Sequence, residues 1–356
     1  MKKIGKVLFG VLGAIVLAAV LFFGWLTVRE YKPADVETLE ILSAEKDTEQ
    51  ELGDSFRVMS WNTGYAGLGA ESDFYMDGGS HVQAADRETV QRYLSGIEQT
   101  LEENAADAYL LQEVDSDSKR SYGIDERTGF MRANSTYALN FSVDFVPSGW
   151  PPIGKVHSGL LTTTDYAIES AERISLPCPF SWPVRTANLK RCLNVSYLPL
   201  EGTDAKLCLI NLHLEAYDSG EGKIAQTNRL RDFMQQEYEK GNYVLAGGDF
   251  NQVFPGSREV WPNTHTDLWE PGVLDDSMLP EGWAFACDVS TPTCRLLNQP
   301  YDPADTENTQ YYVIDGFIVS PNLVVDEVHT VDAGFENSDH NPVLISLHLA
   351  ESETDE

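Results

Sequence analysis

The chain has little positive charge. It contains 25 Lys and Arg residues against 56 Asp and Glu residues, which gives a formal net charge of −31 at pH 7. Proteins bind nucleic acids largely through cationic patches that displace counterions from the phosphates, so this composition disfavours non-specific attraction to DNA or RNA. We therefore expect no stable nucleic-acid partner. A local basic or metal-lined cleft is still compatible with the composition, because net charge governs solubility and steering rather than one site.

The motifs of several enzyme classes are missing. The sequence has no Cys/His zinc spacing, no HExxH, no GxxxxGK followed by Ser or Thr, and no GxSxG. Zincins, P-loop enzymes and serine hydrolases are therefore poorly supported. There is no repeat of 20–50 residues, and no long Gly/Ser or Pro linker divides residues 56–349. A chain of 356 residues with 42% apolar residues can bury a core, so we expect one folded domain in that range.

Cysteine is scarce, and its number is odd. With five cysteines, at least one is unpaired within the chain. Cys208 lies in an apolar strand pattern and is expected to be a buried free thiol. If the domain is extracellular, Cys287 and Cys294 could form a disulfide across the turn between them, and Cys178 and Cys192, which flank a proline-rich loop, could form another.

A long uncharged run stands near the N-terminus. Residues 7–28 contain no charge over 22 positions. As a helix they would reach about 33 Å, enough to cross a hydrocarbon core. A cleavable signal has a shorter apolar stretch of about 7–15 residues, whereas here apolar residues continue for nine positions after Ala18-Ala19. A buried core helix would need a polar face. We interpret residues 1–29 as an uncleaved transmembrane anchor.

Charges around this run set the expected topology. Lys2, Lys3 and Lys6 precede the span, so the positive-inside rule places the N-terminus in the cytoplasm and the rest of the chain outside. We expect a single-pass cell-membrane protein with an extracellular domain over residues 55–349. Residues 30–54 hold nine acids and two bases, typical of a solvated linker, and residues 350–356 form an acidic tail.

Short apolar runs alternate with charged helical stretches in the folded region. Expected helices are Glu88–Asn104 and Gln226–Lys240. The pattern predicts one α/β domain with two central sheets and outer helices. Irregular stretches at 61–87, 116–157, 177–192 and 250–310 mostly follow strands and predict loops gathered around one cleft. The expected strands are Phe56–Ser60, Ala108–Gln112, Gly159–Thr163, Leu193–Leu198, Lys206–Leu214, Tyr243–Gly247, Val313–Val319 and Val343–Leu349.

Polar clusters recur at the ends of these strands. Oxygen atoms of Asp, Glu and Asn suit Mg²⁺, Mn²⁺ or Ca²⁺, and histidine can transfer protons near neutral pH. Asp315 lies inside an apolar strand, where a carboxylate is costly unless it is paired. The clusters are Trp61-Asn62, Gln112-Glu113, Asn211-Leu212-His213, Gly248-Asp249-Phe250-Asn251, Ile314-Asp315-Gly316 and Ser338-Asp339-His340-Asn341-Pro342.

The ordered series WNTG at 61, QEVD at 112, NLHL at 211, GGDFN at 247, VIDGF at 313 and SDHNP at 338 resembles the endonuclease/exonuclease/phosphatase superfamily. That superfamily includes pancreatic-type deoxyribonuclease, abasic-site endonucleases, inositol polyphosphate phosphatases and bacterial sphingomyelinases. The resemblance covers residues 56–349. Each motif is weak alone, but six in family order form a strong signal. The resemblance implies a four-layer sandwich of two mixed β-sheets flanked by helices.

The resemblance also implies a metal centre. Glu113 would be the principal Mg²⁺ carboxylate, and Asn62 and Asp339 match further metal-side residues. Asp249 matches a residue that could touch a second metal. Mn²⁺ or Ca²⁺ would suit the same oxygen ligands.

The same resemblance implies a catalytic group. Asp249 and Asn251 match the pair that orients the attacking water and contacts phosphate. His340 matches the catalytic imidazole, and Asp315 matches the carboxylate that holds it. His213 matches a second imidazole that contacts phosphate or assists the leaving group, and either histidine could be the base. In-line attack on a phosphoester needs an activated water, neutralised phosphoryl charge and help for the leaving oxygen.

Two basic side chains outside these motifs are candidates for binding substrate phosphate. Arg120 follows the Glu113 strand end closely, and His157 enters a strand from a long loop. A solvated surface position is the alternative for each. In the glycine-rich region before residue 80, Asp73 and Asp77 are candidates for additional metal ligands, although a plain loop position is the simpler interpretation.

The sequence therefore predicts a membrane-anchored, externally facing, Mg²⁺-dependent hydrolase of a phosphodiester or phosphomonoester. Alternatives within the resemblance are a nuclease of extracellular DNA or RNA and a sphingomyelinase-like phospholipase. An alternative of another class is a non-catalytic surface binding module that kept the fold. The intact carboxylates weigh against the last, because buried unpaired carboxylates are costly in a fold that does not use them.

Overall fold

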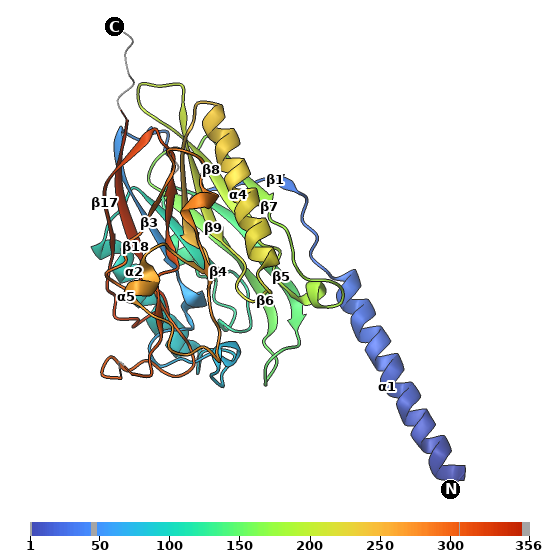
Figure 1. Ribbon diagram of the computed structural model, residues 1–356. Coiled ribbons are helices and arrows are strands. Elements are labelled where there is room, and N and C mark those ends of the chain that lie inside the picture. The colour runs from blue at the N-terminus through green and yellow to red at the C-terminus, as the bar shows by residue number, and fades with distance from the viewer. Residues whose placement is uncertain (1, 44–47, 306, 351–356) are drawn as a thin grey trace.

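The protein is described by a computed structural model that covers residues 2–43, 48–305 and 307–350. The N-terminal helix α1 (Lys2–Val28) projects from a folded body built around two sheets (Figure 1). Its segment Ile4–Val28 is 25 residues long and reaches a mean hydropathy of 2.7 over an 18-residue window. By length and composition this segment suits a membrane span, and a signal sequence would meet the same criterion.

Two seven-stranded mixed sheets form the body. In the first sheet β9 and β10 are parallel, and in the second sheet β3 and β4 are parallel, while the other neighbours are antiparallel. The first sheet has the order β1 (Val36–Thr38), β7 (Ser170–Ser175), β8 (Cys192–Pro199), β9 (Lys206–His213), β10 (Tyr243–Asp249), β16 (Asp315–Val319) and β13 (Ala284–Ala286). The second has the order β17 (Leu323–Thr330), β18 (Val343–Leu349), β3 (Ser55–Asn62), β4 (Ala108–Asp115), β6 (Gly154–Thr164), β5 (Asn134–Val146) and β2 (Ile41–Leu42).

The two sheets pack face to face, and a long helix covers the outer face of each. Alternate residues of a strand point to opposite faces. Leu110 of β4 and Leu209 of β9 therefore meet in the central core. Tyr109 packs under α2 (Arg87–Glu103), and Ile210 packs under α4 (Glu221–Glu239). This four-layer sandwich confirms the predicted fold class.

Smaller elements lie in the connecting loops. Two short helices, two two-stranded ribbons and four 3-10 turns occur among the described residues. They are α3 (Arg127–Phe130), α5 (Ser257–Val260), β11 (Gln252–Val253) with β12 (Gly272–Val273), β14 (Cys294–Arg295) with β15 (Tyr311–Tyr312), and the turns Gly64–Ala66, Tyr75–Asp77, Val184–Ala187 and Asp276–Met278.

Both long helices begin where an aspartate satisfies free backbone N–H groups. Asp86 Oδ1 accepts the N–H of Thr89 at 2.8 Å, so α2 begins one residue before its expected start. Asp218 Oδ2 accepts the N–H groups of Gly220 and Gly222. That contact lets α4 begin at residue 221, five positions before its expected start.

The expected solvated linker, residues 30–54, is partly built into the sheets. β1 pairs with β7 at an edge of the first sheet, and β2 pairs with β5 at an edge of the second. Strand β5 itself lies inside the stretch 116–157, which was expected to be irregular, and β7 and β17 were not expected either. Strands β1 and β2 are held by backbone pairing with partners distant in the chain, and acidic composition gives no indication of such pairing.

Neither of the two possible disulfides is present. All five cysteines lie in described parts of the chain, and all are free. Cys192 is buried against Ala138 and Leu160, whereas Cys178 is exposed in its loop. The burial of Cys208 as a free thiol agrees with its prediction.

Candidate functional site

Three strands of the first sheet bring polar residues into one row. Asp249, the last residue of β10, is paired in register with His213, the last of β9, and with Asp315, the first of β16. Gly248 precedes Asp249 with a φ of 152°, and a Cβ at this position would lie 2.0 Å from the Leu212 carbonyl oxygen. Only glycine allows this approach of β10 to β9, so the glycine positions the row.

The second sheet contributes Asn62 and Glu113. Asn62 ends β3 and pairs with Gln112 of β4. Glu113 follows at an irregularity in the β4–β6 pairing and has a φ of 55°. Left-handed backbone at a residue other than glycine is strained by about 1–3 kcal/mol and is concentrated at functional sites. The bulge re-aims the Glu113 side chain toward the first sheet.

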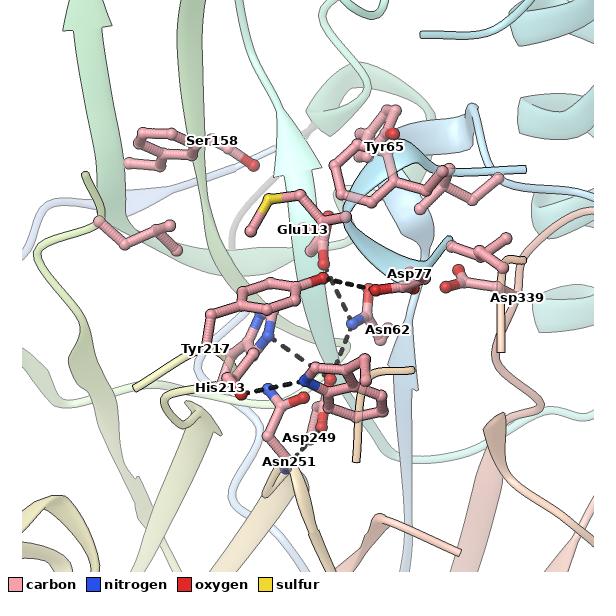
Figure 2. A pocket seen from close by; sticks show the side chains of 18 of the residues that line it. Asn62, Tyr65, Asp77, Glu113, Ser158, His213, Tyr217, Asp249, Asn251 and Asp339 are labelled. Atoms are coloured by element: carbon pink, nitrogen blue, oxygen red, sulfur yellow. Dashed lines mark hydrogen bonds and ion pairs between the residues drawn. The ribbon is translucent and has the colours of Figure 1, made fainter. Parts of the chain in front are cut away.

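The two sets of side chains meet at a cavity of about 380 Å³ (Figure 2). Of the ten predicted site residues, only Asp315 and His157 do not line it. Its lining includes the predicted residues Asn62, Glu113, Arg120, His213, Asp249, Asn251, Asp339 and His340.

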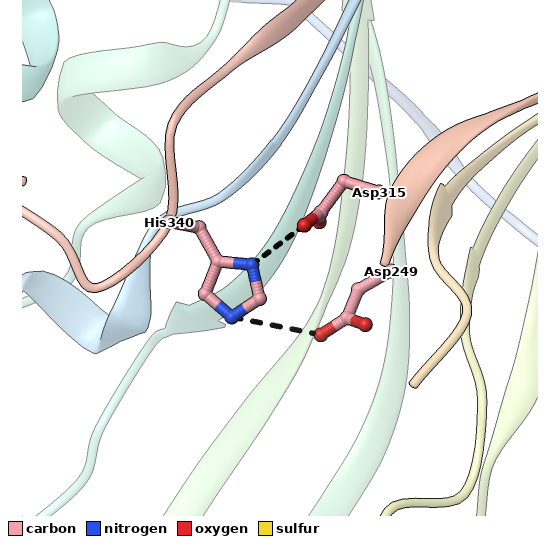
Figure 3. Close-up of side chains that lie close together, drawn as sticks. All are labelled: Asp249, Asp315 and His340. Carbon is pink, nitrogen blue, oxygen red and sulfur yellow. Dashed lines mark hydrogen bonds and ion pairs between the residues drawn. The ribbon is translucent and has the colours of Figure 1, made fainter. Parts of the chain in front are cut away.

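His340 and Asp315 form a buried pair (Figure 3). His340 Nδ1 lies 2.8 Å from Asp315 Oδ2, and Asp315 stands behind the imidazole, away from the cavity. Burial alone would lower the pKa of His340, but the charge of Asp315, further charges at Cys294 and Asp339, and the hydrogen bond to Asp315 together hold that pKa well above its usual value. The imidazolium form is therefore favoured at neutral pH.

Asp249 lies at the centre of the site. Its Oδ2 is 3.0 Å from Asn62 Nδ2, 3.5 Å from His213 Nε2 and 3.8 Å from His340 Nε2. Its Oδ1 accepts the N–H of Asn251 at 2.8 Å. Burial and the nearby charge of Asp315 raise the pKa of Asp249 to about 7. Asp249 can therefore gain or lose a proton in the physiological range.

His213 differs from His340 in charge. Burial, followed by the positive charge of Arg191, lowers the pKa of His213 well below its usual value. Its Nδ1 has no hydrogen-bond partner among the described residues. Arg191 donates to the His213 carbonyl oxygen at 3.0 Å and forms a 3.3 Å ion pair with Glu215. The site thus holds one neutral and one cationic imidazole.

A group of acidic side chains faces the other half of the cavity. Burial raises the pKa of Asp339 to about 6, and the charge of Glu113 adds to the shift. Burial raises the pKa of Asp77 to about 7, with further contributions from Asp339 and Glu113. The Tyr217 hydroxyl donates to Asp77 Oδ1 at 3.0 Å. The raised pKa values of Asp339 and Asp77 indicate that Glu113, Asp339 and Asp77 repel one another across the cavity.

Asn62 and Asn251 have defined hydrogen bonds within the site. Asn62 Nδ2 lies 3.3 Å from Glu113 Oε1 in addition to its contact with Asp249, and Asn62 Oδ1 accepts the N–H of Gly64 at 3.1 Å. Asn251, with a φ of 50°, donates from Nδ2 to the Leu214 carbonyl oxygen at 2.8 Å. Asn62 therefore links the carboxylate of one sheet to that of the other.

Arg120 is a fixed positive charge in the cavity wall. Its guanidinium donates to Asp115 at 3.1 Å and 2.9 Å and lies 3.7 Å from the centre of the Tyr65 ring. Its Nη1 is 3.8 Å from Glu113 Oε2. The solvated surface position that was the alternative for this arginine is excluded by its burial.

His157, the second basic candidate, lies on β6 outside the cavity lining. Its Nε2 is 3.4 Å from Ser142 Oγ, and burial lowers its pKa. Two lining residues, Tyr217 and Glu215, had no signal in the sequence, because neither stands in a motif and each reaches the cavity only through the fold. Asp73 does not line the cavity and instead accepts backbone N–H groups of its own loop.

No protein-family model and no curated protein matches the sequence. Solved structures do match. An endonuclease/exonuclease/phosphatase from Beutenbergia cavernae DSM 12333 aligns with a TM-score of 0.57 and 16% identity over 85% of this chain and 73% of that one. ANGEL2, a 2′,3′-cyclic phosphatase, aligns with a TM-score of 0.54 and 15% identity over 88% and 99%. The human Nocturnin catalytic domain aligns with a TM-score of 0.51 and 16% identity over 88% and 97%. At these identities the likeness shows a shared fold.

Proposed function

From the endonuclease/exonuclease/phosphatase fold that the chain shares with these structures, we infer that it is a metal-dependent phosphoric ester hydrolase. One observation supports this most strongly. Glu113 and Asn62 on one sheet meet His213 and Asp249 on the other in a single cavity, with His340 beside them. Perturbed acids and bases gathered in a concave site are typical of catalysis.

The donor set suits a hard divalent cation. Glu113 and Asp339 face the same space, and the charge of Glu113 contributes to the raised pKa of Asp339, as expected of carboxylates close enough to share a cation. We assign Mg²⁺, with Mn²⁺ or Ca²⁺ as substitutes, to these two carboxylates, with Asn62 orienting Glu113. Bound there, the cation would neutralise charge on the phosphoryl oxygens.

A second group of possible ligands has a different role in this proposal. Donor atoms of Asp249, Asp315 and His340 all lie within 4.8 Å of one another. We assign this group to proton transfer, because the Asp315–His340 hydrogen bond already occupies Nδ1 and Mg²⁺ prefers oxygen ligands to imidazole. Asp249 lies between the two groups and is the residue that both could use.

The chain's own residues can then carry out hydrolysis. Asp249, held by the Asn251 N–H, orients a water molecule in line with the leaving oxygen and accepts its proton as the new P–O bond forms. His340 donates its Nε2 proton to the leaving oxygen as the old P–O bond breaks, while Asp315 holds Nδ1–H. Neutral His213 contacts a phosphoryl oxygen. Arg120 adds positive charge at the cavity wall.

We also propose that α1 anchors the enzyme in the cell membrane with the catalytic domain outside. The apolar length of α1 and the three lysines before the span support this topology. In a Cys178→Ser background, accessibility of Asp204→Cys, at an exposed position in the turn between β8 and β9, to an impermeant maleimide on intact cells would test it. Labelling only after lysis would contradict an external domain.

The catalytic proposal is tested with the full-length protein in detergent. Hydrolysis is assayed on DNA, RNA, sphingomyelin, phosphatidylcholine and inositol phosphates, with Mg²⁺ and with chelator. We expect chelator-sensitive cleavage that His340→Ala and Asp249→Asn reduce at least 100-fold, while the surface variant His329→Ala remains within twofold of wild type. Absence of chelator-sensitive cleavage in a folded, metal-loaded protein would favour the binding-module alternative.

A further inference from the structure

The chain that leaves α1 is fixed to the folded body. Arg29 Nε lies 2.5 Å from Asp144 Oδ2 at the end of β5. Glu30, whose side chain is 3% exposed, lies 3.1 Å from Lys190 Nζ and 3.4 Å from Arg185 Nε. Strands β1 and β2 follow within a few residues. The anchor therefore continues into the domain through paired charges and sheet hydrogen bonds, and it sets the orientation of the domain.

The last turns of α1 pack on two defined segments. One is the β5–β6 hairpin, where the ring of Phe145 lies 6.2 Å from that of Phe22. The other is loop 177–191, where Trp182 lies 6.0 Å from Phe23 and donates from Nε1 to Thr27 Oγ1 at 3.0 Å. If α1 crosses a bilayer, both segments lie at the level where the helix emerges from it.

These two segments also expose large apolar side chains. Trp150 lies at the hairpin tip, residues 147–153 between β5 and β6, and is 88% exposed. Trp182 and Val184 in loop 177–191 are 53% and 55% exposed. The hairpin tip and α1 project from the same side of the body (Figure 1). Tryptophan is enriched at the boundary between hydrocarbon and water in membrane proteins. The position and the chemistry of this surface both suit lipid headgroups.

The same segments form one wall of the catalytic cavity. Phe141, Val146 and Ile153 come from the hairpin, and Phe180 and Leu189 come from loop 177–191. Together with the polar Asn140, Ser148 and Asn188 of the same segments, they form a largely apolar wall between the side of the molecule next to the anchor and the polar group around Asp249. An amphiphile that enters from a bilayer would meet this wall before its phosphate reached the carboxylates.

We propose that the hairpin tip and loop 177–191 rest on the bilayer and that the site hydrolyses the phosphate ester of a membrane lipid. This substrate class rests on the proposed hydrolase function, whereas the docking surface does not. A water-soluble ester would need neither an anchor fixed to the domain nor an apolar wall shared with the anchor contacts.

The first experiment compares one headgroup in two physical states. Full-length protein in vesicles is given phosphatidylglycerol, phosphatidylcholine or phosphatidic acid as bilayer-forming dioleoyl lipids or as soluble dihexanoyl lipids. Bis(4-nitrophenyl) phosphate reports hydrolysis without a lipid. We expect at least one dioleoyl lipid to be cleaved with a kcat/KM at least tenfold above that of its dihexanoyl form. Hydrolysis of the soluble esters with no such preference would overturn the lipid assignment and leave the hydrolase intact. If nothing is hydrolysed, the proposed function fails, and the lipid assignment fails with it.

Matched variants localise the effect. Trp150→Asp should lower kcat/KM on the bilayer lipid at least fivefold and leave bis(4-nitrophenyl) phosphate hydrolysis within twofold, because Trp150 does not line the cavity. Val324→Asp changes an apolar side chain that is 39% exposed on β17, which lies away from α1 (Figure 1), and should leave both rates within twofold. Equal losses in both variants would contradict a specific surface.

A second measurement does not depend on activity. Tryptophan fluorescence is recorded in vesicles with and without lipids brominated close to the headgroup, for wild type and for Trp150→Phe. We expect the quenched fraction to fall in Trp150→Phe, because Trp150 is in contact with lipid. An unchanged quenched fraction would place the hairpin tip in water and overturn the docking surface.

Discussion

Asp315 controls the charge of His340 from a position that substrate does not reach. It is buried behind the imidazole, and its Oδ1 has no hydrogen-bond partner among the described residues. Asp315→Asn preserves the shape of the side chain but removes the charge that raises the His340 pKa. We expect kcat to fall by about 10²–10⁴-fold, as for loss of a general acid or base. Steady-state kinetics with circular dichroism as a check on folding would measure this.

The chain offers a matched control for that variant. His348 and Asp326 form another histidine–aspartate pair, 2.9 Å apart, but both side chains are exposed on the second sheet. Asp326→Asn should leave kcat within twofold. Equal losses from the two substitutions would mean that the effect of Asp315 is not specific to the site.

Asp77 gives the metal-free protein a defined pH dependence. Its pKa is raised from 3.8 to about 7, so the folded state favours the protonated form. The stability from this group is therefore fully present below pH 3.8 and is lost as pH rises through about 7. In chelator, we expect the wild-type Tm to fall between pH 5 and pH 8 more steeply than the Tm of Asp77→Asn.

Asp73, in the same loop, has a pKa shift opposite to that of Asp77 and therefore the opposite pH dependence of stability. Backbone N–H groups of Ser80 and His81 outweigh its partial burial and lower its pKa. Stability from Asp73 is present above pH 3.8 and is lost as pH falls through its lowered pKa. Asp73→Asn should therefore not flatten the decline in Tm between pH 5 and pH 8. A flattening equal to that of Asp77→Asn would refute the assignment to Asp77.

At the level of secondary structure, the cap of α2 is a separable source of stability. Asp86 is exposed, and its Oδ1 accepts the Thr89 N–H. Asp86→Ala should lower the free energy of unfolding by about 1 kcal/mol, and Asp86→Asn should preserve it, because both Asp and Asn serve as N-caps. Urea denaturation would measure both. A loss of the same size in Asp86→Asn would point to a charge effect instead.

The elements that the sequence predicts well are those with a strong local pattern. Val90, Ile97 and Leu101 recur at helical spacing in α2, and the apolar residues of β3, β4, β9 and β10 form continuous runs. Strand β5 could not be predicted in this way, because its buried and half-buried positions do not alternate cleanly over its 13 residues. β1 and β2 are two or three residues long and exist only through pairing with β7 and β5.

The site shows the same contrast between features with a local sequence pattern and features that depend on the fold. Its motif residues could be predicted because they end strands or stand beside them, so the fold brings them to one edge. The residues that contact these motif residues and set their protonation or position could not be predicted. The stacking of Arg120 on Tyr65, the hydrogen bond from Tyr217 to Asp77 and the contact of Arg191 with the His213 carbonyl all join residues with no relation in sequence pattern.

For the whole molecule, the repulsion among Glu113, Asp339 and Asp77 predicts that a bound cation stabilises the fold. A ligand that binds only the folded state adds about 2.7 kcal/mol at a free concentration 100 times its Kd. We expect millimolar Mg²⁺ to raise Tm by several degrees over chelator, and Glu113→Gln to remove most of that shift. Differential scanning fluorimetry would measure it. An unchanged Tm in wild type would count against a cation at this site.

The pairing of β1 and β2 also has a consequence for the order in which the protein matures. Val36 pairs with Ile174, and Ile41 pairs with Thr136, so each segment leaves the ribosome more than 90 residues before its partner. Contacts that distant in the chain form late, because closing the intervening loop is entropically unfavourable. If α1 inserts as it is synthesised, residues 30–42 wait beside the membrane, unpaired, until the body behind them has folded. Pairing of β1 and β2 then completes one edge of each sheet and joins the folded body to the residues that follow α1.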